Sequence, residues 1–221
     1  MSKIFQQGSY STLYGGLYEG TITAEEALKH GRAGIGTLDG ADGEVIIWDG
    51  VIYHGNSKNQ VREVKAGETL PYVAVIEATT DITFDSNDLS FKNLLNNFLE
   101  KIPSKNTAYS LVISGEFHHV EITSKPEKNG ERAYLDILAE QPHFTKENLS
   151  GTIVGIWAPE MFESLYGNGF HLHFISDDRA FGAHLVDFEA TKVTVKIGQI
   201  DKMEQQFPIT SETFQKMTFE K

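Results

Sequence analysis

The chain has 221 residues and no cysteine, and its 31 Asp and Glu residues outnumber 19 Lys and Arg residues to give a formal charge of −12. This length allows one large domain or two small units that share a core. The acidic charge disfavours nucleic acid and anionic membranes as partners. The absence of thiols excludes disulfides and cysteine-ligated metals, so any metal site must use His, Asp or Glu.

The start of the chain, MSKIFQQGSY, lacks the basic-then-apolar pattern of a secretion signal. No apolar run approaches the ~20 residues that a helix needs to cross a bilayer. We therefore expect a cytoplasmic protein with no membrane partner.

The N-terminal half alternates short apolar segments with turn residues. Thr23 followed by Glu26 resembles a capping box and predicts a helix over residues 24–30. The spacing of apolar side chains predicts a second helix over residues 91–101. Turn sequences such as DGADG separate the remaining apolar runs, which predicts strands at residues 34–38, 44–48, 51–54, 71–78 and 80–84.

The C-terminal half is also rich in predicted strands. Two of them, residues 109–113 and 118–123, are expected to flank a turn at Ser114 and Gly115, before a polar loop. Short helices are predicted over residues 134–140 and 159–165, the second with proline at its start. Further strands are predicted at residues 151–157, 170–175, 184–189 and 193–197.

Many strands with a few scattered helices indicate an α+β protein with mixed or antiparallel β-sheets. Each half contains a strand-rich block with acidic turns, which a distant duplication would explain. We therefore expect two related β-rich halves, residues 1–103 and 104–221. The second half holds the most informative segment of the chain, GFHLHFISDDRAFGAHLVDFE at residues 169–189.

Three histidines in that segment have the spacing of a metal site. His171 and His173 are two residues apart, so a strand would point both side chains to the same face. If residues 177–180 form a hairpin turn, His184 lies opposite His173 and the three imidazoles converge. Three neutral nitrogen ligands with an open position suit catalytic Zn²⁺, although Co²⁺, Ni²⁺ or Fe²⁺ would also fit. The alternative is three ordinary strand histidines.

Four segments closely resemble bacterial acetolactate decarboxylases. They are STLYGGLYEGTIT at residues 11–23, GTLDGADGEVIIWDG at residues 36–50, GTIVGIWAPEMF at residues 151–162, and the histidine segment. The resemblance runs over nearly the whole chain. It implies a zinc enzyme with mixed sheets in two related halves, which forms a homodimer and converts a small 2-hydroxy-3-oxo acid, 2-acetolactate, to acetoin.

The resemblance also implies roles for individual residues. His171, His173 and His184 would be the zinc ligands, Glu44 would be a catalytic carboxylate, and Thr37 would lie near the substrate. Without the resemblance, Glu44 would be interpreted as a solvated carboxylate at the start of a strand.

The chain departs from the family pattern at two positions. Relatives carry an arginine that helps to hold the substrate carboxylate, and the matching substrate-binding position here is Thr123. Lys125 and Arg132 are candidate replacements for that arginine. Relatives also extend into an acidic tail with a second active-site glutamate, for which Glu220 is the candidate in this chain.

These departures leave alternatives to zinc-dependent acetolactate decarboxylation. The chain would be a catalytically impaired zinc-binding paralogue, or a decarboxylase of a different 2-hydroxy-3-oxo acid. A binding protein without enzymatic activity and a zinc hydrolase are further alternatives, since fold alone does not fix function.

Overall fold

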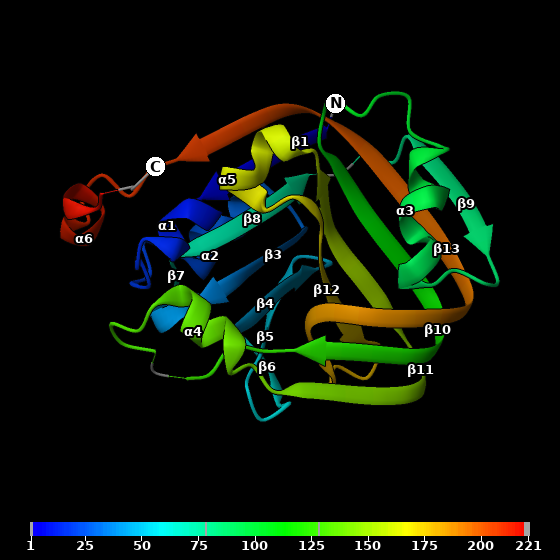
Figure 1. Ribbon diagram of the computed structural model, residues 1–221, viewed down its shortest axis with the longest axis horizontal. Helices are drawn as coiled ribbons and strands as arrows, with labels where there is room; N and C mark the ends of the chain where they lie inside the picture. Colours follow the sequence, from blue (N-terminus) through cyan, green and yellow to red (C-terminus); the bar gives the residue numbers. More distant parts are fainter. Residues whose placement is uncertain (1, 78, 128, 219–221) are drawn as a thin grey trace.

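The computed structural model describes residues 2–77, 79–127 and 129–218 (Figure 1). Most of the strands join one 11-stranded sheet in the order β10-β11-β12-β13-β1-β8-β3-β4-β5-β6, with β9 paired to β13. From the first half of the chain come β1 (Ser2–Gln7), β3 (Ala33–Leu38), β4 (Asp42–Trp48), β5 (Val51–Gly55), β6 (Val61–Glu63), β8 (Tyr72–Glu77) and β9 (Ile82–Ser86). From the second half come β10 (Tyr109–Thr123), β11 (His143–Ala158), β12 (Gly169–Ser176) and β13 (Gly182–Gln206).

The helices are short and lie around this sheet (Figure 1). They are α1 (Tyr10–Tyr14), α2 (Ala24–Ala27), α3 (Phe91–Leu99), α4 (Tyr134–Ala139), α5 (Glu163–Tyr166) and α6 (Glu212–Lys216), with 3-10 turns η1 (Leu28–His30), η2 (Asp39–Ala41) and η3 (Glu160–Phe162). A separate two-stranded sheet pairs β2 (Ile22–Thr23) with β7 (Thr69–Leu70). None of the helices in the described part of the chain has the length and apolar character required to span a membrane.

The pairing confirms the predicted α+β class with mixed sheets. β1 runs parallel to β13 and antiparallel to β8, whereas the other pairs in the large sheet are antiparallel. Because β10 pairs with both β11 and β13, the strands β10, β11, β12 and β13 form a closed ring of pairings. β1 joins this ring to the N-terminal strands, and the division into units at residues 103 and 104 stays a prediction.

The expected turn at Ser114 and Gly115 is wrong, because β10 continues through both residues. Gly115 stays in register with Gly151 on one side and Val193 on the other. A Cβ atom at this position would lie 2.2 Å from the carbonyl oxygen of Lys192. The glycine therefore allows two backbones to approach closely and does not turn the chain.

The two strands expected at residues 184–189 and 193–197 are likewise one strand. The intervening residues remain paired, since Ala190 lies opposite Phe117 and Lys192 lies opposite Glu116. The result is the long strand β13, which contacts β12 and β10 before it continues along β1. The strand β1 is a further difference, since no strand is predicted there from the sequence.

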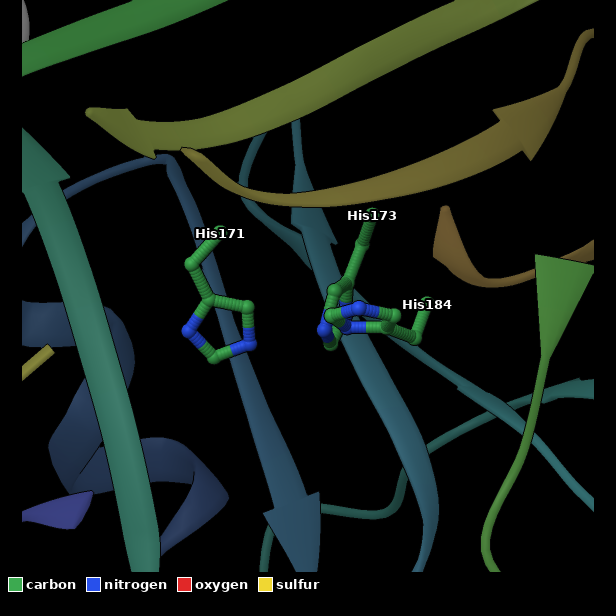
Figure 2. Close-up of side chains that lie close together, drawn as sticks. All are labelled: His171, His173 and His184. Atoms are coloured by element: carbon green, nitrogen blue, oxygen red, sulfur yellow. The ribbon is translucent and has the colours of Figure 1, made fainter. Parts of the chain in front are cut away.

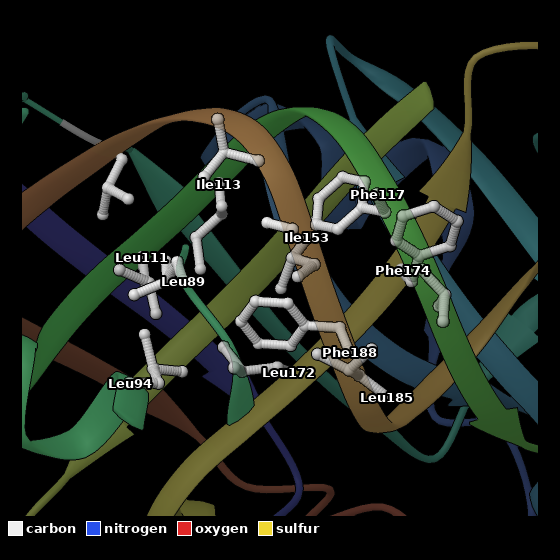
Figure 3. Packing of buried hydrophobic residues seen from close by; sticks show 14 of the residues in the cluster. Leu89, Leu94, Leu111, Ile113, Phe117, Ile153, Leu172, Phe174, Leu185 and Phe188 are labelled. Carbon is white, nitrogen blue, oxygen red and sulfur yellow. The ribbon is translucent and has the colours of Figure 1, made fainter. Parts of the chain in front are cut away.

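A hydrophobic core fills the ring formed by β10 to β13 (Figure 3). Phe117 packs edge-on against Phe174, with 5.4 Å between the ring centroids. The predicted helical spacing in α3 is confirmed by Leu94 and Phe98, which are buried against this core. Burial of such a side chain contributes about 1.5–3 kcal/mol relative to exposure.

A second set of buried side chains holds the N-terminal strands against the ring. Ile46 of β4 and Tyr53 of β5 pack with Val154 of β11 and Ile175 of β12. This packing lays β4 across β12, which brings residues from the start of β4 close to the histidines of β12.

Candidate metal centre

The hairpin between β12 and β13 positions the three histidines as the sequence predicted. His171 and His173 lie two residues apart on β12, and His173 is the direct cross-strand neighbour of His184 on β13. The turn between the strands includes Arg179 in the left-handed region, at φ 58°. It is closed by a hydrogen bond from the Ser176 amide to the carbonyl of Phe181.

The three imidazoles form a nearly regular triangle. Each pair of ring centroids is 5.3 Å apart, and the rings converge from β12 and β13 (Figure 2). One side-chain nitrogen from each histidine lies within 4.8 Å of the corresponding nitrogens of the other two. This arrangement could hold a metal ion with three nitrogen ligands.

Hydrogen bonding leaves the nitrogens of this triangle free to coordinate. Nδ1 of His173 donates to the carbonyl oxygen of Val45 at 2.8 Å, which fixes the tautomer and leaves a lone pair on Nε2. That Nε2 atom and Nδ1 of His171 are buried without a hydrogen-bond partner among the described residues. An unpaired buried nitrogen costs roughly 1–3 kcal/mol, and coordination to a divalent ion would remove this cost. The donor set therefore fits a metal.

The protonation states also suit coordination. Burial lowers the pKa of both His171 and His173 well below the ordinary value. Burial and, to a smaller extent, the Lys125 charge lower the pKa of His184 to about 4. The three rings are consequently neutral at pH 7, which is the state in which imidazole binds a metal.

Glu44 lies directly beside this triangle. Its Oε2 atom is 3.5 Å from Nε2 of His173, and its Oε1 atom accepts a hydrogen bond from the buried Lys125 ammonium. Burial raises the pKa of Glu44, although the Lys125 charge acts in the opposite direction. The preceding Gly43 has φ 55°, and a Cβ atom there would clash with the His54 ring. Glycine is thus required for the turn that brings Glu44 into the site.

His171, His184 and Glu44 border a cavity of about 180 Å³. Its polar lining comprises Thr37, Glu44, Lys125, Gln141, His171 and His184. The apolar and aromatic lining comprises Tyr10, Leu13, Tyr72, Tyr134 and Leu138. A small cavity with a few convergent polar groups and an apolar wall is suited to a small organic ligand.

Thr37 lines the cavity, as the resemblance implies. Its hydroxyl donates to the carbonyl of Gly43 at 2.9 Å, so it also supports the turn before Glu44.

Thr123 is buried next to His184 in the strand register, but its hydroxyl donates to the carbonyl of Pro142. It is not among the residues that line the cavity. Glu220 lies outside the described residues. The roles of all these residues stay predictions.

Of the two candidate replacements for the family arginine, Lys125 is the one that the fold brings into the cavity. Arg132, the other candidate, pairs instead with Glu140 at 2.8 Å on the surface. Sequence reasoning could not choose between the two, because Lys125 follows β10 in a polar segment with no sign of burial. No sequence signal marks Gln141 or Tyr72 as cavity residues, since nothing in the local pattern separates them from ordinary loop and strand residues.

Comparisons with known proteins find relatives over nearly the full length of this chain. The family model described as alpha-acetolactate decarboxylase matches residues 4–221. The alpha-acetolactate decarboxylase of Lactococcus lactis subsp. lactis (strain IL1403) is 39% identical over 215 residues, which cover 97% of this chain and 91% of the relative. The enzyme of the same name from Bacillus licheniformis is 31% identical over 219 residues, covering 97% of this chain and 86% of the relative.

Solved structures show the same fold. A Staphylococcus aureus protein described as similar to alpha-acetolactate decarboxylase superposes with a TM-score of 0.95 at 36% identity, over 99% of this chain and 94% of the other. The alpha-acetolactate decarboxylase of Bacillus subtilis strain 168 gives a TM-score of 0.92 at 29% identity, over 98% and 93% of the two chains. The full-length matches and the shared fold lead to one conclusion: this chain belongs to the alpha-acetolactate decarboxylase family.

Proposed function

We propose that this chain decarboxylates 2-acetolactate to acetoin and uses Zn²⁺ held by His171, His173 and His184. The observation that carries the proposal is the triangle of neutral imidazoles at the edge of a small cavity that also contains Glu44 and Lys125. The names of the relatives support the choice of 2-acetolactate as the substrate. When bound, the divalent ion would supply a Lewis acid for the negative charge that develops as CO₂ leaves.

Lys125 supplies the positive charge that binds the substrate carboxylate. A lysine ammonium has three donor hydrogens. Among the described residues, the acceptor for the ammonium of Lys125 is Glu44. The ammonium lines the cavity although its side chain is only 5% exposed. An anionic ligand in the cavity would compensate this buried charge better than solvent can.

Glu44 supplies the proton that completes the reaction. As the bond between the carboxyl carbon and its neighbour breaks, CO₂ leaves and the electron pair moves toward the adjacent ketone. The carbon that lost CO₂ must then take up a proton to give acetoin. The Oε2 atom of Glu44 lies on the side of His173, where a protonated carboxyl can donate into the site. Water then returns a proton to the carboxylate.

The test is acetoin formation from 2-acetolactate by the purified chain, measured against the spontaneous reaction without protein. We expect acetoin well above this background, loss of activity after chelation, and recovery when Zn²⁺ is restored. Acetoin at the background rate with zinc-loaded protein would contradict the proposal and favour an impaired paralogue or a non-enzymatic binding protein. Turnover of another 2-hydroxy-3-oxo acid alone would favour the changed-substrate alternative.

The homodimer and the cytoplasmic location also remain predictions. The molar mass of the purified chain in solution, measured by light scattering, tests the first of them. A mass of twice the 24.6 kDa chain is the expected result.

A further inference from the structure

Tyr72 has a place in the site that the proposed mechanism does not use. It begins β8, lies directly opposite Thr37 in the pairing with β3, and lines the same cavity. Its ring is nearly parallel to the His171 ring, at 16° and 6.2 Å between centroids. The side chain of Tyr10 meets it edge-on, with 5.9 Å between centroids. Tyr72 therefore forms part of the wall beside the metal centre.

The hydroxyl of Tyr72 has no hydrogen-bond partner among the described residues, although the residue is only 2% exposed. Two other buried tyrosines, Tyr109 and Tyr18, have partners for their hydroxyls. The hydroxyl of Tyr109 donates to the carbonyl of Ser104 at 2.7 Å, and that of Tyr18 donates to the carbonyl of Arg132 at 2.8 Å. A buried hydroxyl without a partner is unfavourable and is uncommon away from functional sites.

The surroundings of Tyr72 keep this hydroxyl in its donor form. Burial raises the pKa of Tyr72 well above its ordinary value, and the nearby Tyr10 and Glu44 add to the effect. The phenol is thus protonated at neutral pH. It can donate one hydrogen bond to an oxygen atom that enters the cavity.

We propose that the Tyr72 hydroxyl binds the substrate by donating a hydrogen bond to an oxygen of its keto-alcohol group. This inference rests on the proposed function and adds a second polar contact between the protein and the substrate. Lys125 recognises the carboxylate, which the reaction removes, whereas Tyr72 contacts a group that substrate and product share. The binding of acetoin, which is neutral, should consequently depend on Tyr72 and not on Lys125.

The test compares Tyr72→Phe with the wild type in three measurements. The first is kcat/KM for 2-acetolactate, which we expect to fall about tenfold, as for loss of one buried hydrogen bond. The second is the inhibition constant of acetoin, which we expect to rise by a similar factor. The third is the melting temperature of the metal-free protein, which should stay the same or rise, because the substitution removes an unpaired buried hydroxyl.

Tyr109→Phe is the matched control. It removes an equally buried hydroxyl that has a partner and lies in the core of the β10–β13 ring, away from the cavity. It should lower the melting temperature by a few degrees and leave both kinetic constants unchanged. The opposite patterns of the two variants separate a ligand contact from a structural one.

The outcomes distinguish this inference from the proposed function. If the wild type produces acetoin and Tyr72→Phe matches it in both kinetic constants, the inference is wrong and the function stands. If the wild type is inactive, the rise in melting temperature on adding acetoin replaces the kinetic readout. A smaller rise in Tyr72→Phe then supports the contact, and equal rises or no rise at all contradict it.

Discussion

His173 shows at the residue scale how the fold prepares a ligand. The backbone carbonyl of Val45 accepts a hydrogen bond from Nδ1, and this leaves Nε2 turned toward His171, His184 and Glu44. One backbone contact thus fixes both the tautomer and the orientation of the ring. The same strand, β4, places Glu44 one residue before Val45, so the ligand and the carboxylate share one support.

Glu44→Gln separates proton donation from metal binding. The amide keeps the size of the side chain but cannot deliver a proton, so turnover should fall by roughly 10²–10⁴-fold. The metal content should not change, since the three imidazoles remain. Both quantities can be measured on the same preparation, by acetoin formation and by elemental analysis. Full activity in this variant would remove Glu44 from the proposed role.

Lys125→Met tests the carboxylate contact. Loss of a charged hydrogen bond of about 1.5–3 kcal/mol should raise KM for 2-acetolactate by roughly 10–100-fold. The inhibition constant of acetoin should stay near the wild-type value, because acetoin has no carboxylate. Lys125→Arg, which keeps the charge, is the control and should recover part of the affinity. An unchanged KM in Lys125→Met would show that the substrate anion binds elsewhere.

At the scale of elements, local pattern predicted several segments well and failed where pairing partners decide. The helix α3 was predictable from the spacing of its apolar residues, and the hairpin of β12 and β13 from the spacing of its histidines. Both signals lie within a short stretch of sequence. The length of β10 was not, because Gly115 resembles a turn residue. Its need for close backbone contact with β13 appears only in the folded sheet.

The connection between β6 and β7 provides a test of stability against pH. Arg62 binds both carboxylate oxygens of Glu68, at 2.6 and 2.8 Å, and the amide of Lys65 donates to the same carboxylate. The hydrogen bonds from Arg62 lower the pKa of Glu68 from 4.5 to about 2. The ionised group therefore stabilises the fold above pH 4.5, and this contribution is lost as the pH falls toward 2.

Glu68→Gln should consequently be less stable than the wild type at pH 7, by up to about 1 kcal/mol, since the ion pair is partly exposed. The difference should shrink as the pH falls below 4.5 and vanish near pH 2. Melting temperatures of both proteins over this range give the measurement. A difference that is constant with pH would mean that the contribution of Glu68 is not ionic.

At the scale of the whole molecule, the site draws on distant parts of the chain. The hydrogen bond between Lys125 and Glu44 joins residues 81 positions apart, and that between His173 and Val45 spans 128 positions. The histidine triangle was predictable, since it needs only one strand and one hairpin. The pairing of Lys125 with Glu44 was not, because it depends on how β4 crosses the β10–β13 ring. For Glu44, only the family resemblance pointed to an active-site role.

The most direct test of the central claim is the metal content of the purified chain, measured by elemental analysis beside the His173→Ala variant. We predict one zinc ion per wild-type chain and loss of both the metal and acetoin formation in the variant. His173→Ala protein that retains stoichiometric zinc, or metal-free wild type that forms acetoin at the full rate, would contradict the account.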